Sequence, residues 1–196
     1  MIIRNDDVAF DTNLDHLERF CRICDRFNVR IMQAITFAGV CVTVSRRMSN
    51  WEILNLAPQS DISLRTDLIT FLKSRPTDLI AAHGLFHTHS PNFDEVCVAR
   101  DKLTKLGLSP SYYVPPFNEG NYGEVVAGMA VSGTSAGKLE ECIAHNTPAR
   151  IEIMYLHSWR FDTDCSRQYV HPSMKRRFNL NDLELWLTAR RINGSS

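Results

Sequence analysis

The sequence predicts an α/β fold, a distorted (β/α) barrel with roughly seven parallel strands. Short apolar runs alternate with longer stretches whose apolar residues recur at helical spacing, which is typical of β–α units. No repeat or linker interrupts the 196 residues, and their 44% hydrophobic content is ample for one core. Polar residues follow several expected strands, at the edge where the carboxyl ends of parallel strands meet. We therefore expect a single domain over residues 1–196.

The first half of the chain is expected to form three strands and the helices that follow them. The strands are apolar runs at residues 1–5, 31–37 and 78–82, and a helix covers residues 64–72. Thr12 and Asp15 have the spacing of a capping box, so we expect the first helix to begin there. Cys21 and Cys24 lie in this helix, and we interpret them as buried positions and not as a redox or zinc motif.

The second half continues the alternation. Ser90 and Pro91 are expected to begin a helix that ends at Gly107. Further strands are expected at residues 111–114 and 151–156, and a helix at residues 138–145. Asn179 and Asp182 are expected to cap the last helix.

Charge and hydropathy argue against a nucleic-acid-binding surface and against a membrane-spanning helix. The 22 basic and 22 acidic residues give a net charge of zero, so no nucleic-acid surface is expected. No apolar run approaches the roughly 20 residues of a transmembrane helix. Residues 1–3 lead directly into Arg4 without the apolar stretch of a signal peptide, so we expect a cytoplasmic protein.

Two histidines and an aspartate predict a metal site. His83 and His87 are four residues apart, which would place both imidazoles on one side of a helical turn. Two imidazoles and one carboxylate form a standard ligand set for a catalytic zinc-like ion, and Asp7 can supply the carboxylate. His89 is an alternative ligand, because His87 and His89 could also pair on an extended segment. We expect one divalent ion, zinc, although cobalt, nickel or manganese suit the same ligands.

Asp6 and His157 are the expected catalytic residues. Asp6 and Asp7 follow the first expected strand, so one carboxylate can bind the metal while the other takes a proton from the attacking water. His157 also follows an apolar strand, where a histidine can be purely structural. If it faces the same site, its imidazole can protonate a leaving amine.

These residues resemble, in order, the motifs of the polysaccharide deacetylase family (NodB-type, carbohydrate esterase family four). Asp6 and Asp7 are similar to the first motif, in which the first aspartate is the base and the second a metal ligand. The segment from His83 to His87 resembles the second motif, whose two histidines bind the metal. The resemblance covers nearly the whole chain and implies one catalytic domain with its site at the strand ends.

The later motifs supply the expected substrate contacts. Residues 114–117 resemble the third motif, which forms a groove wall and an oxyanion donor, and Leu156 with His157 resembles the last motif. The expected substrate-binding residues are Pro116, Phe117, Asn118 and Trp159.

Three departures indicate a divergent member of the family. Val114 stands where the family often has an arginine, which leaves Arg4 as a candidate to orient Asp6. Gly84 replaces a serine or threonine, and the family's Asp-x-x-Asp-Trp motif is not recognisable.

The resemblance implies a metal-dependent amide hydrolase that removes an N-acetyl group from an amino sugar or glycan precursor. Asp6 would accept the proton of the attacking water, a backbone N–H near Phe117 would hold the oxyanion, and His157 would protonate the amine. Two alternatives stay open. The substrate could be a non-sugar amide or a cyclic imide, or the chain could be a non-catalytic sugar-binding module on the same scaffold.

Overall fold

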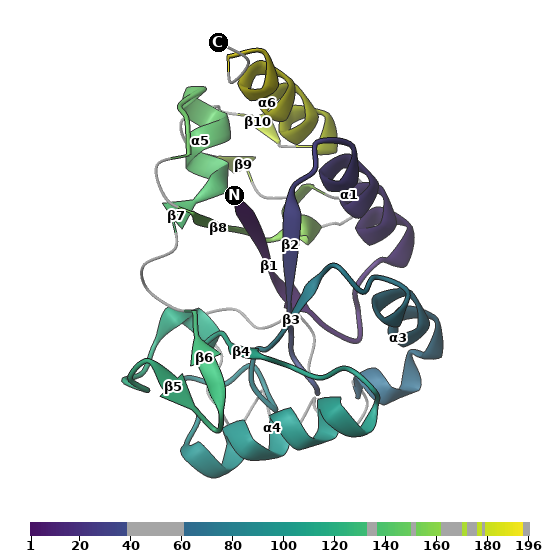
Figure 1. Ribbon diagram of the computed structural model, residues 1–196, viewed down its shortest axis with the longest axis vertical. Helices are drawn as coiled ribbons and strands as arrows, with labels where there is room; N and C mark the ends of the chain where they lie inside the picture. Colours follow the sequence, from purple (N-terminus) through teal and green to yellow (C-terminus); the bar gives the residue numbers. More distant parts are fainter. Residues whose placement is uncertain are drawn as a thin grey trace. The chain divides into compact units, whose positions relative to one another are not determined.

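The computed structural model describes residues 1–38, 61–132, 137–149, 152–161, 170–171, 176–177 and 179–193. The chain divides into two compact units. Figure 1 shows the ribbon coloured by residue number. Unit 1 comprises Met1–Asn5, Asn13–Ile31 and Ala136–Ser196, and unit 2 comprises Asp6–Thr12 and Met32–Ser135. The strands β1 (Ile2–Val8) and β2 (Arg30–Ile35) each contribute residues to both units. The single-domain assignment stays a prediction.

Unit 2 is built on parallel strands. They are β3 (Leu79–Ala82), β4 (Tyr112–Tyr113) and β6 (Met129–Val131), joined to β2 in the order β2, β3, β4, β6. Ile31, Met32, Ala34 and Ile35 of β2 are fully buried. A strand of a parallel sheet is covered on both faces, which explains why side chains on both faces of β2 are buried, the polar Gln33 among them.

A hairpin closes this side of the sheet. The strand β5 (Val125–Val126) pairs antiparallel with β6 through a turn at Ala127 and Gly128, whose φ angles are 49° and 76°. Two left-handed residues in a two-residue loop are typical of hairpin turns, because their twist matches that of the strands. The sequence pattern does not predict these strands, because two or three residues are too few to show alternation.

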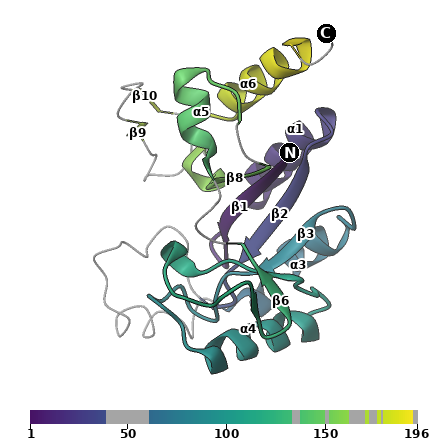
Figure 2. The same cartoon turned by 60° about the vertical axis from the view of Figure 1, so that its left-hand side comes forward.

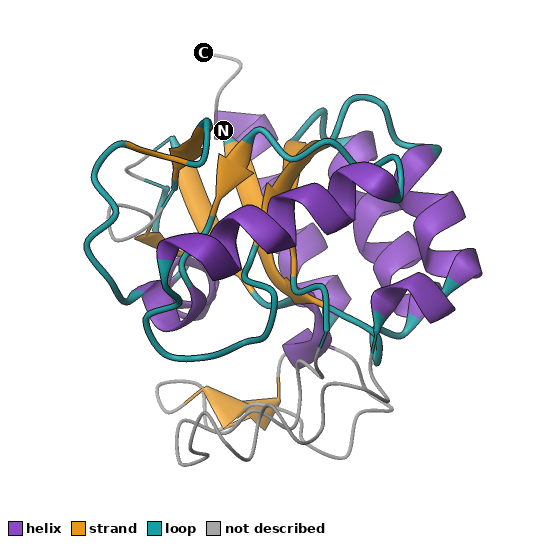
Figure 3. Ribbon diagram, turned by 90° about the horizontal axis from the view of Figure 1, so that it is seen from below, coloured by secondary structure: helices purple, strands orange, loops and turns teal. Residues whose placement is uncertain are grey.

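Two helices of unit 2 flank the strands, α3 (Thr66–Lys73) and α4 (Phe93–Lys105), with short helical turns η2 (Ile62–Leu64) and η3 (Pro116–Asn118). Figure 3 looks onto α4, which packs on β3. The helix α4 begins at Asn92 and not at Ser90. Ser90 has a φ of 46°, outside the helical region, whereas Asn92 and Glu95 form a capping box with two 2.9 Å hydrogen bonds.

Unit 1 pairs β1 with β8 (Ile153–Leu156) and β8 with β7 (Gly137–Lys138), both in parallel. Its helices are α1 (Leu14–Arg26), α5 (Leu139–His145) and α6 (Leu180–Asn193), with η4 (Ser158–Phe161) and a small ladder of β9 (Val170–His171) and β10 (Arg176–Arg177). Figure 2 shows α5 and α6 next to each other, and α5 packs on β8. The helix predicted at residues 138–145 and the cap at Asn179 are confirmed.

The first helix begins one residue later than predicted. Asn13 is its N-cap, because its side chain accepts a 3.2 Å hydrogen bond from the N–H of His16. The Thr12 hydroxyl instead accepts from the N–H of Ala9 and stabilises the preceding turn. Cys21 and Cys24 are 1% and 0% exposed, which confirms them as buried helix positions.

The strands follow the hydrogen-bonded order β5-β6-β4-β3-β2-β1-β8-β7. The predicted α/β class with a mostly parallel sheet is confirmed. Among the described residues the sheet is open, because its order ends at β5 and β7 and these strands do not pair with each other. No described helix has both the length and the apolar character required to cross a membrane.

Candidate metal centre

Three buried side chains of unit 2 bring their ligand atoms together. Asp7 Oδ1 lies 3.1 Å from His83 Nε2 and 2.9 Å from His87 Nε2, and the two Nε2 atoms are 3.2 Å apart. All three residues are less than 8% exposed. The structure therefore assembles the three residues that the sequence selected as metal ligands, although they come from positions up to 80 residues apart.

The spacing of these atoms fits a metal ion. Ligand atoms bound at zinc-like distances and at tetrahedral or octahedral angles are about 2.9–3.4 Å from one another. The three observed separations, 2.9, 3.1 and 3.2 Å, fall in this range. Two imidazole nitrogens that face each other can share only one proton, whereas a cation satisfies both nitrogens and the carboxylate together.

Asp7 adopts an unusual backbone conformation inside β1. Its φ is +65°, in the left-handed region that costs a non-glycine residue about 1–2 kcal/mol. The ladder resumes directly afterwards, because the carbonyl of Val8 accepts a 2.9 Å hydrogen bond from the N–H of Thr36. The sequence analysis places Asp6 and Asp7 after the first strand, and this prediction is wrong, because both residues lie within β1. The positive φ breaks the strand's regular alternation at the ligand, which is typical of strain at functional sites.

His83 is oriented by a backbone carbonyl. It follows β3, and its Nδ1 lies 2.8 Å from the carbonyl oxygen of Val114. A carbonyl only accepts hydrogen bonds, so Nδ1 carries a proton, and Nε2 is the ring nitrogen left to bind a cation beside Asp7 and His87. Sequence reasoning missed this role of Val114, because a backbone acceptor leaves no trace in the residue type.

The electrostatics of His83 favour a positive charge at the cluster. Burial by itself lowers the pKa of His83, but the hydrogen bond to Asp7 and the charges of Asp7 and Asp6 outweigh it, so the pKa is raised. A proton on His83 therefore competes with a cation for this position.

The segment between the two histidines is a turn and not the predicted helical turn. Gly84 has a φ of +94°, which excludes an α-helix at this point. A Cβ placed on Gly84 would lie 2.6 Å from the carbonyl oxygen of Phe86, so no larger residue fits without movement. The glycine that departs from the family motif is thus required by the tight turn that brings His87 to His83.

Phe117 separates His87 from His89. Its ring packs edge-on against His87, with centroids 4.5 Å apart, and stacks on His89 at 4.0 Å and 10°. His89 Nδ1 pairs with Glu119 Oε2 at 2.9 Å, so His89 does not take the place of His83 in the cluster. Phe117 and Asn118 both have left-handed φ angles, 57° and 56°, in the turn η3 that places the ring there.

The expected catalytic residues lie in different units. Asp6 is 3% exposed and adjoins Asp7 in unit 2. His157 follows β8 in unit 1, as predicted, and its Nδ1 lies 3.6 Å from Oε1 of Glu140, which is 3% exposed. Sequence reasoning missed Glu140. A helical wheel offers the missing signal, because Glu140 shares the buried stripe of α5 with Ile143, three residues later.

The predicted roles of Arg4 and Trp159 are not tested by the structure. Arg4 is fully buried in unit 1, with its guanidinium 5.1 Å from the centre of the Tyr155 ring, and its proposed action on Asp6 stays a prediction. Trp159 belongs to η4, but its side chain lies outside the described residues, so its role as a substrate contact also stays a prediction.

No protein-family model matches this sequence, and no curated protein matches it. Solved structures do match its fold. The family 4 acetyl xylan esterase from Clostridium thermocellum, in complex with a cobalt ion, has a TM-score of 0.56 at 13% identity, covering 99% of this chain and 85% of that chain. The family 4 carbohydrate esterase from Streptomyces lividans, in complex with acetate, has a TM-score of 0.52 at 8% identity, covering 96% and 87%.

The peptidoglycan deacetylase PdaC from Bacillus subtilis is similar as well, with a TM-score of 0.51 at 10% identity, covering 99% of this chain and 94% of that chain. At such identities the similarity establishes the fold. The resemblance that the sequence motifs indicate is confirmed at this level: the chain has the fold of the family 4 carbohydrate esterases and deacetylases.

Proposed function

We propose that the protein is a metal-dependent hydrolase that removes an N-acetyl group from an amino sugar or a glycan precursor. The observation that carries this proposal is the buried cluster of Asp7, His83 and His87, with Asp6 next to it in the chain. The shared fold adds support, because the similar structures include esterases and deacetylases that act on carbohydrates.

The cluster would hold one divalent ion through Asp7 Oδ1, His83 Nε2 and His87 Nε2. Zinc is our first choice, and cobalt, nickel or manganese suit the same donor set. The cobalt ion in the Clostridium thermocellum structure agrees with such a set. When bound, the ion would supply a Lewis acid for the acetyl carbonyl and for the attacking water.

The chain's own residues would move the protons. Asp6 would accept a proton from the attacking water as the general base. His157 would donate a proton to the departing amine, and the buried carboxylate of Glu140, 3.6 Å from its Nδ1, would keep the imidazole oriented.

The turn η3 would contact the substrate. The N–H groups of Asn118 and Glu119 donate to the carbonyls of Pro115 and Pro116, at 3.0 and 3.1 Å. We therefore propose the N–H of Phe117 as the oxyanion donor. Pro116, Asn118 and the ring of Phe117 would form one wall of the sugar site, and Trp159 would add an aromatic surface.

We propose the cytosol as the compartment. Cys97 and Cys142 are free thiols in the described part of the chain, which agrees with a reducing environment. Substrates met there would be soluble, nucleotide-linked or lipid-linked amino sugars.

A second candidate reaction is the removal of an O-acetyl group from a glycan. It is favoured by the similarity to an acetyl xylan esterase, since the same metal and base would serve an ester as well as an amide. In that reaction the leaving group is an alkoxide, which needs less help from His157 than an amine does.

One assay separates these readings. The protein is treated with a chelator, reloaded with zinc or cobalt, and incubated with N-acetylglucosamine oligosaccharides, acetylated xylan and a panel of non-sugar amides and cyclic imides. We expect metal-dependent acetate release from the N-acetylated sugars. Release from acetylated xylan alone would establish the second candidate, and activity confined to the non-sugar panel would overturn both. Binding of sugars without turnover of any compound would identify a non-catalytic module.

A further inference from the structure

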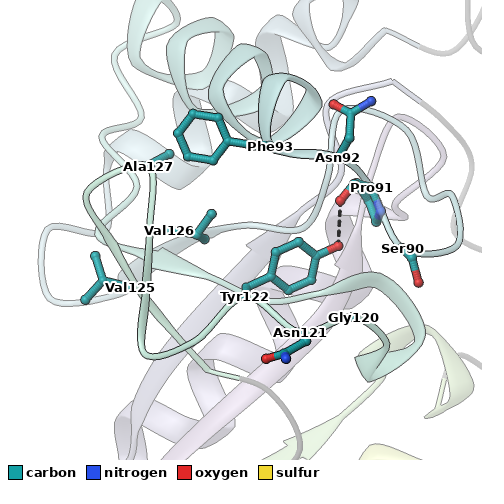
Figure 4. Close-up of a pocket in the computed structure, with 10 residues that line it drawn as sticks. All are labelled: Ser90, Pro91, Asn92, Phe93, Gly120, Asn121, Tyr122, Val125, Val126 and Ala127. Atoms are coloured by element: carbon teal, nitrogen blue, oxygen red, sulfur yellow. Dashed lines mark hydrogen bonds between the residues drawn. The ribbon is translucent and has the colours of Figure 1, made fainter.

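A pocket of unit 2 lies outside the metal centre, at the N-terminus of α4 (Figure 4). Its volume of about 490 Å³ lies within the range of about 300–1,000 Å³ that is usual for small-molecule sites. It is lined by Ser90, Pro91, Asn92, Phe93, Gly120, Asn121, Tyr122, Val125, Val126 and Ala127, which we call the Tyr122 pocket. None of these ten residues carries a charge, so the pocket suits a neutral ligand.

The lining has the chemistry that recognises a sugar ring. Figure 4 shows the rings of Phe93 and Tyr122 on opposite sides of the pocket. Phe93 and Val125 are 60% and 64% exposed, and large apolar side chains grouped at a pocket are typical of binding surfaces. Two asparagines and a serine add neutral hydrogen-bonding groups. Aromatic faces cover the C–H groups of a pyranose, while amides and hydroxyls pair with its hydroxyl groups.

The Tyr122 ring is held in place before any ligand binds. Its hydroxyl donates a 2.7 Å hydrogen bond to the carbonyl of Pro91, and its ring packs edge-on against Tyr113 with centroids 5.0 Å apart. Gly120 lies so close that a Cβ there would be 2.3 Å from a carbon of the Tyr122 ring. A ring fixed in this way loses little conformational entropy when a ligand stacks on it.

The same two segments connect this pocket to the metal centre. Residues 87–92 and 117–122 run together, joined by the stack of His89 on Phe117, the 2.9 Å ion pair of His89 with Glu119, and the hydrogen bond between Tyr122 and Pro91. One end of the first segment carries the ligand His87, and the other end lines the pocket. Ser90 follows His87 by three residues, so their Cα atoms are at most about 11 Å apart. A few linked sugar rings would span this distance.

We propose that the Tyr122 pocket is a second sugar subsite, which holds an uncharged pyranose ring of an oligosaccharide whose acetylated ring lies at the metal centre. The proposal rests on the proposed function for the reaction, whereas sugar binding in the pocket is independent of it. The substrate is then a chain of sugars and not a single amino sugar.

Binding is tested with metal-loaded protein and two neutral tetrasaccharides without acetyl groups, xylotetraose and cellotetraose, by calorimetry and NMR titration. We expect at least one tetrasaccharide to bind and to perturb residues of the Tyr122 pocket. Phe93→Ala should weaken its binding about 2- to 10-fold, the range for a lost aromatic contact. Val125→Asp, which adds a charge at an exposed position, should weaken it as well.

The matched control is Val98→Ala, since Val98 is an exposed apolar residue of the same helix that does not line the pocket. It should bind as the wild-type protein does. The subsite is overturned if neither tetrasaccharide binds, or if folded Phe93→Ala and Val125→Asp both bind as tightly as Val98→Ala.

A kinetic arm separates the subsite from the proposed function. The tetrasaccharide of N-acetylglucosamine should give a higher kcat/KM for acetate release than the monosaccharide, and Phe93→Ala should reduce this preference. Acetate release without any preference for chain length would contradict the subsite and leave the proposed function in place. Tetrasaccharide binding at the pocket without acetate release would support the subsite and contradict the proposed function.

Discussion

The single oxygen Oδ1 of Asp7 joins the three residues of the candidate metal site, because it lies within 3.1 Å of both histidine nitrogens. The left-handed φ of Asp7 is unfavourable, and the surrounding hydrogen-bonded strands stabilise it. Next to Asp7, Asp6 is also buried but is not one of the three cluster residues. The proposed function gives the two neighbours separate tasks, which substitutions can distinguish.

Asp6→Asn is expected to keep the metal and lose most turnover. The amide has the size of the carboxylate but cannot accept the water's proton, and removal of a general base typically costs about 10²–10⁴-fold in kcat. Metal content and acetate release are measured on the same sample. Asp11→Asn, an exposed acid of the same unit, is the control and should retain full activity. Loss of the metal in Asp6→Asn would instead make Asp6 a ligand.

Glu140→Gln is expected to lower kcat about 10- to 100-fold, because the imidazolium of His157 would lose the negative charge beside it. A purely structural role would leave the shape of the pH profile of kcat unchanged, so the profile is the deciding measurement. Glu141→Gln alters the neighbouring exposed carboxylate and should change neither kcat nor the profile. Matching profiles for wild type and Glu140→Gln would remove Glu140 from the mechanism.

Metal binding should strengthen as the pH rises, because the pKa of His83 is raised in the metal-free protein and its proton competes with the cation. The stability of the metal-free protein depends on pH in the opposite direction. The stability gained from the protonated His83 is present at low pH and is lost as the pH rises through the raised pKa. Thermal unfolding with and without zinc, from about pH 5 to about pH 8, should show a difference in Tm that grows with pH. A difference independent of pH would contradict this.

At the scale of elements, two turns position the site. The turn that begins at Gly84 brings His87 to His83, and the left-handed pair Phe117 and Asn118 places the aromatic ring against His87. Sequence patterns locate both segments through their histidines and prolines. They do not reveal the φ angles, because strained conformations arise from tertiary contacts and not from local preference. The late start of α1 has a local cause: Thr12 and Asn13 are both good caps in isolation, but the Thr12 hydroxyl already accepts a hydrogen bond from the N–H of Ala9.

Gly84→Ser restores the residue type of the family motif and is nevertheless expected to destabilise the protein. It combines a left-handed φ with a Cβ only 2.6 Å from a carbonyl oxygen, so we expect a loss of about 3 kcal/mol. Gly123→Ser is the matched control, because its φ is also left-handed, +67°, but nothing lies within 4 Å of the added Cβ. It should lose only about 1–2 kcal/mol in thermal unfolding. Equal losses would show that the contact at Gly84 is unimportant.

At the scale of the whole molecule, the alternation of strands and helices was sufficient to predict the α/β class and the position of two histidines directly after strands, whereas Asp7 lies within β1. His83 follows β3 and His157 follows β8, as the apolar runs indicated. The short strands β5 and β6 were not predictable, because two or three residues are too few to show an alternating pattern. The sequence analysis missed Glu140 as well, although its place on the buried stripe of α5 is visible on a helical wheel. The fold was therefore more accessible from the sequence than the supporting residues of the site.

The most direct test of the central claim is the metal stoichiometry of the folded protein and of its ligand variants, measured by elemental analysis after reloading with zinc. The account predicts one ion per chain in the wild type, and its loss in Asp7→Ala, His83→Ala and His87→Ala. His89→Ala should retain the ion, because His89 pairs with Glu119 outside the cluster. A wild-type protein that binds no ion, or an ion retained in all three folded ligand variants, would contradict the claim that Asp7, His83 and His87 form the metal centre.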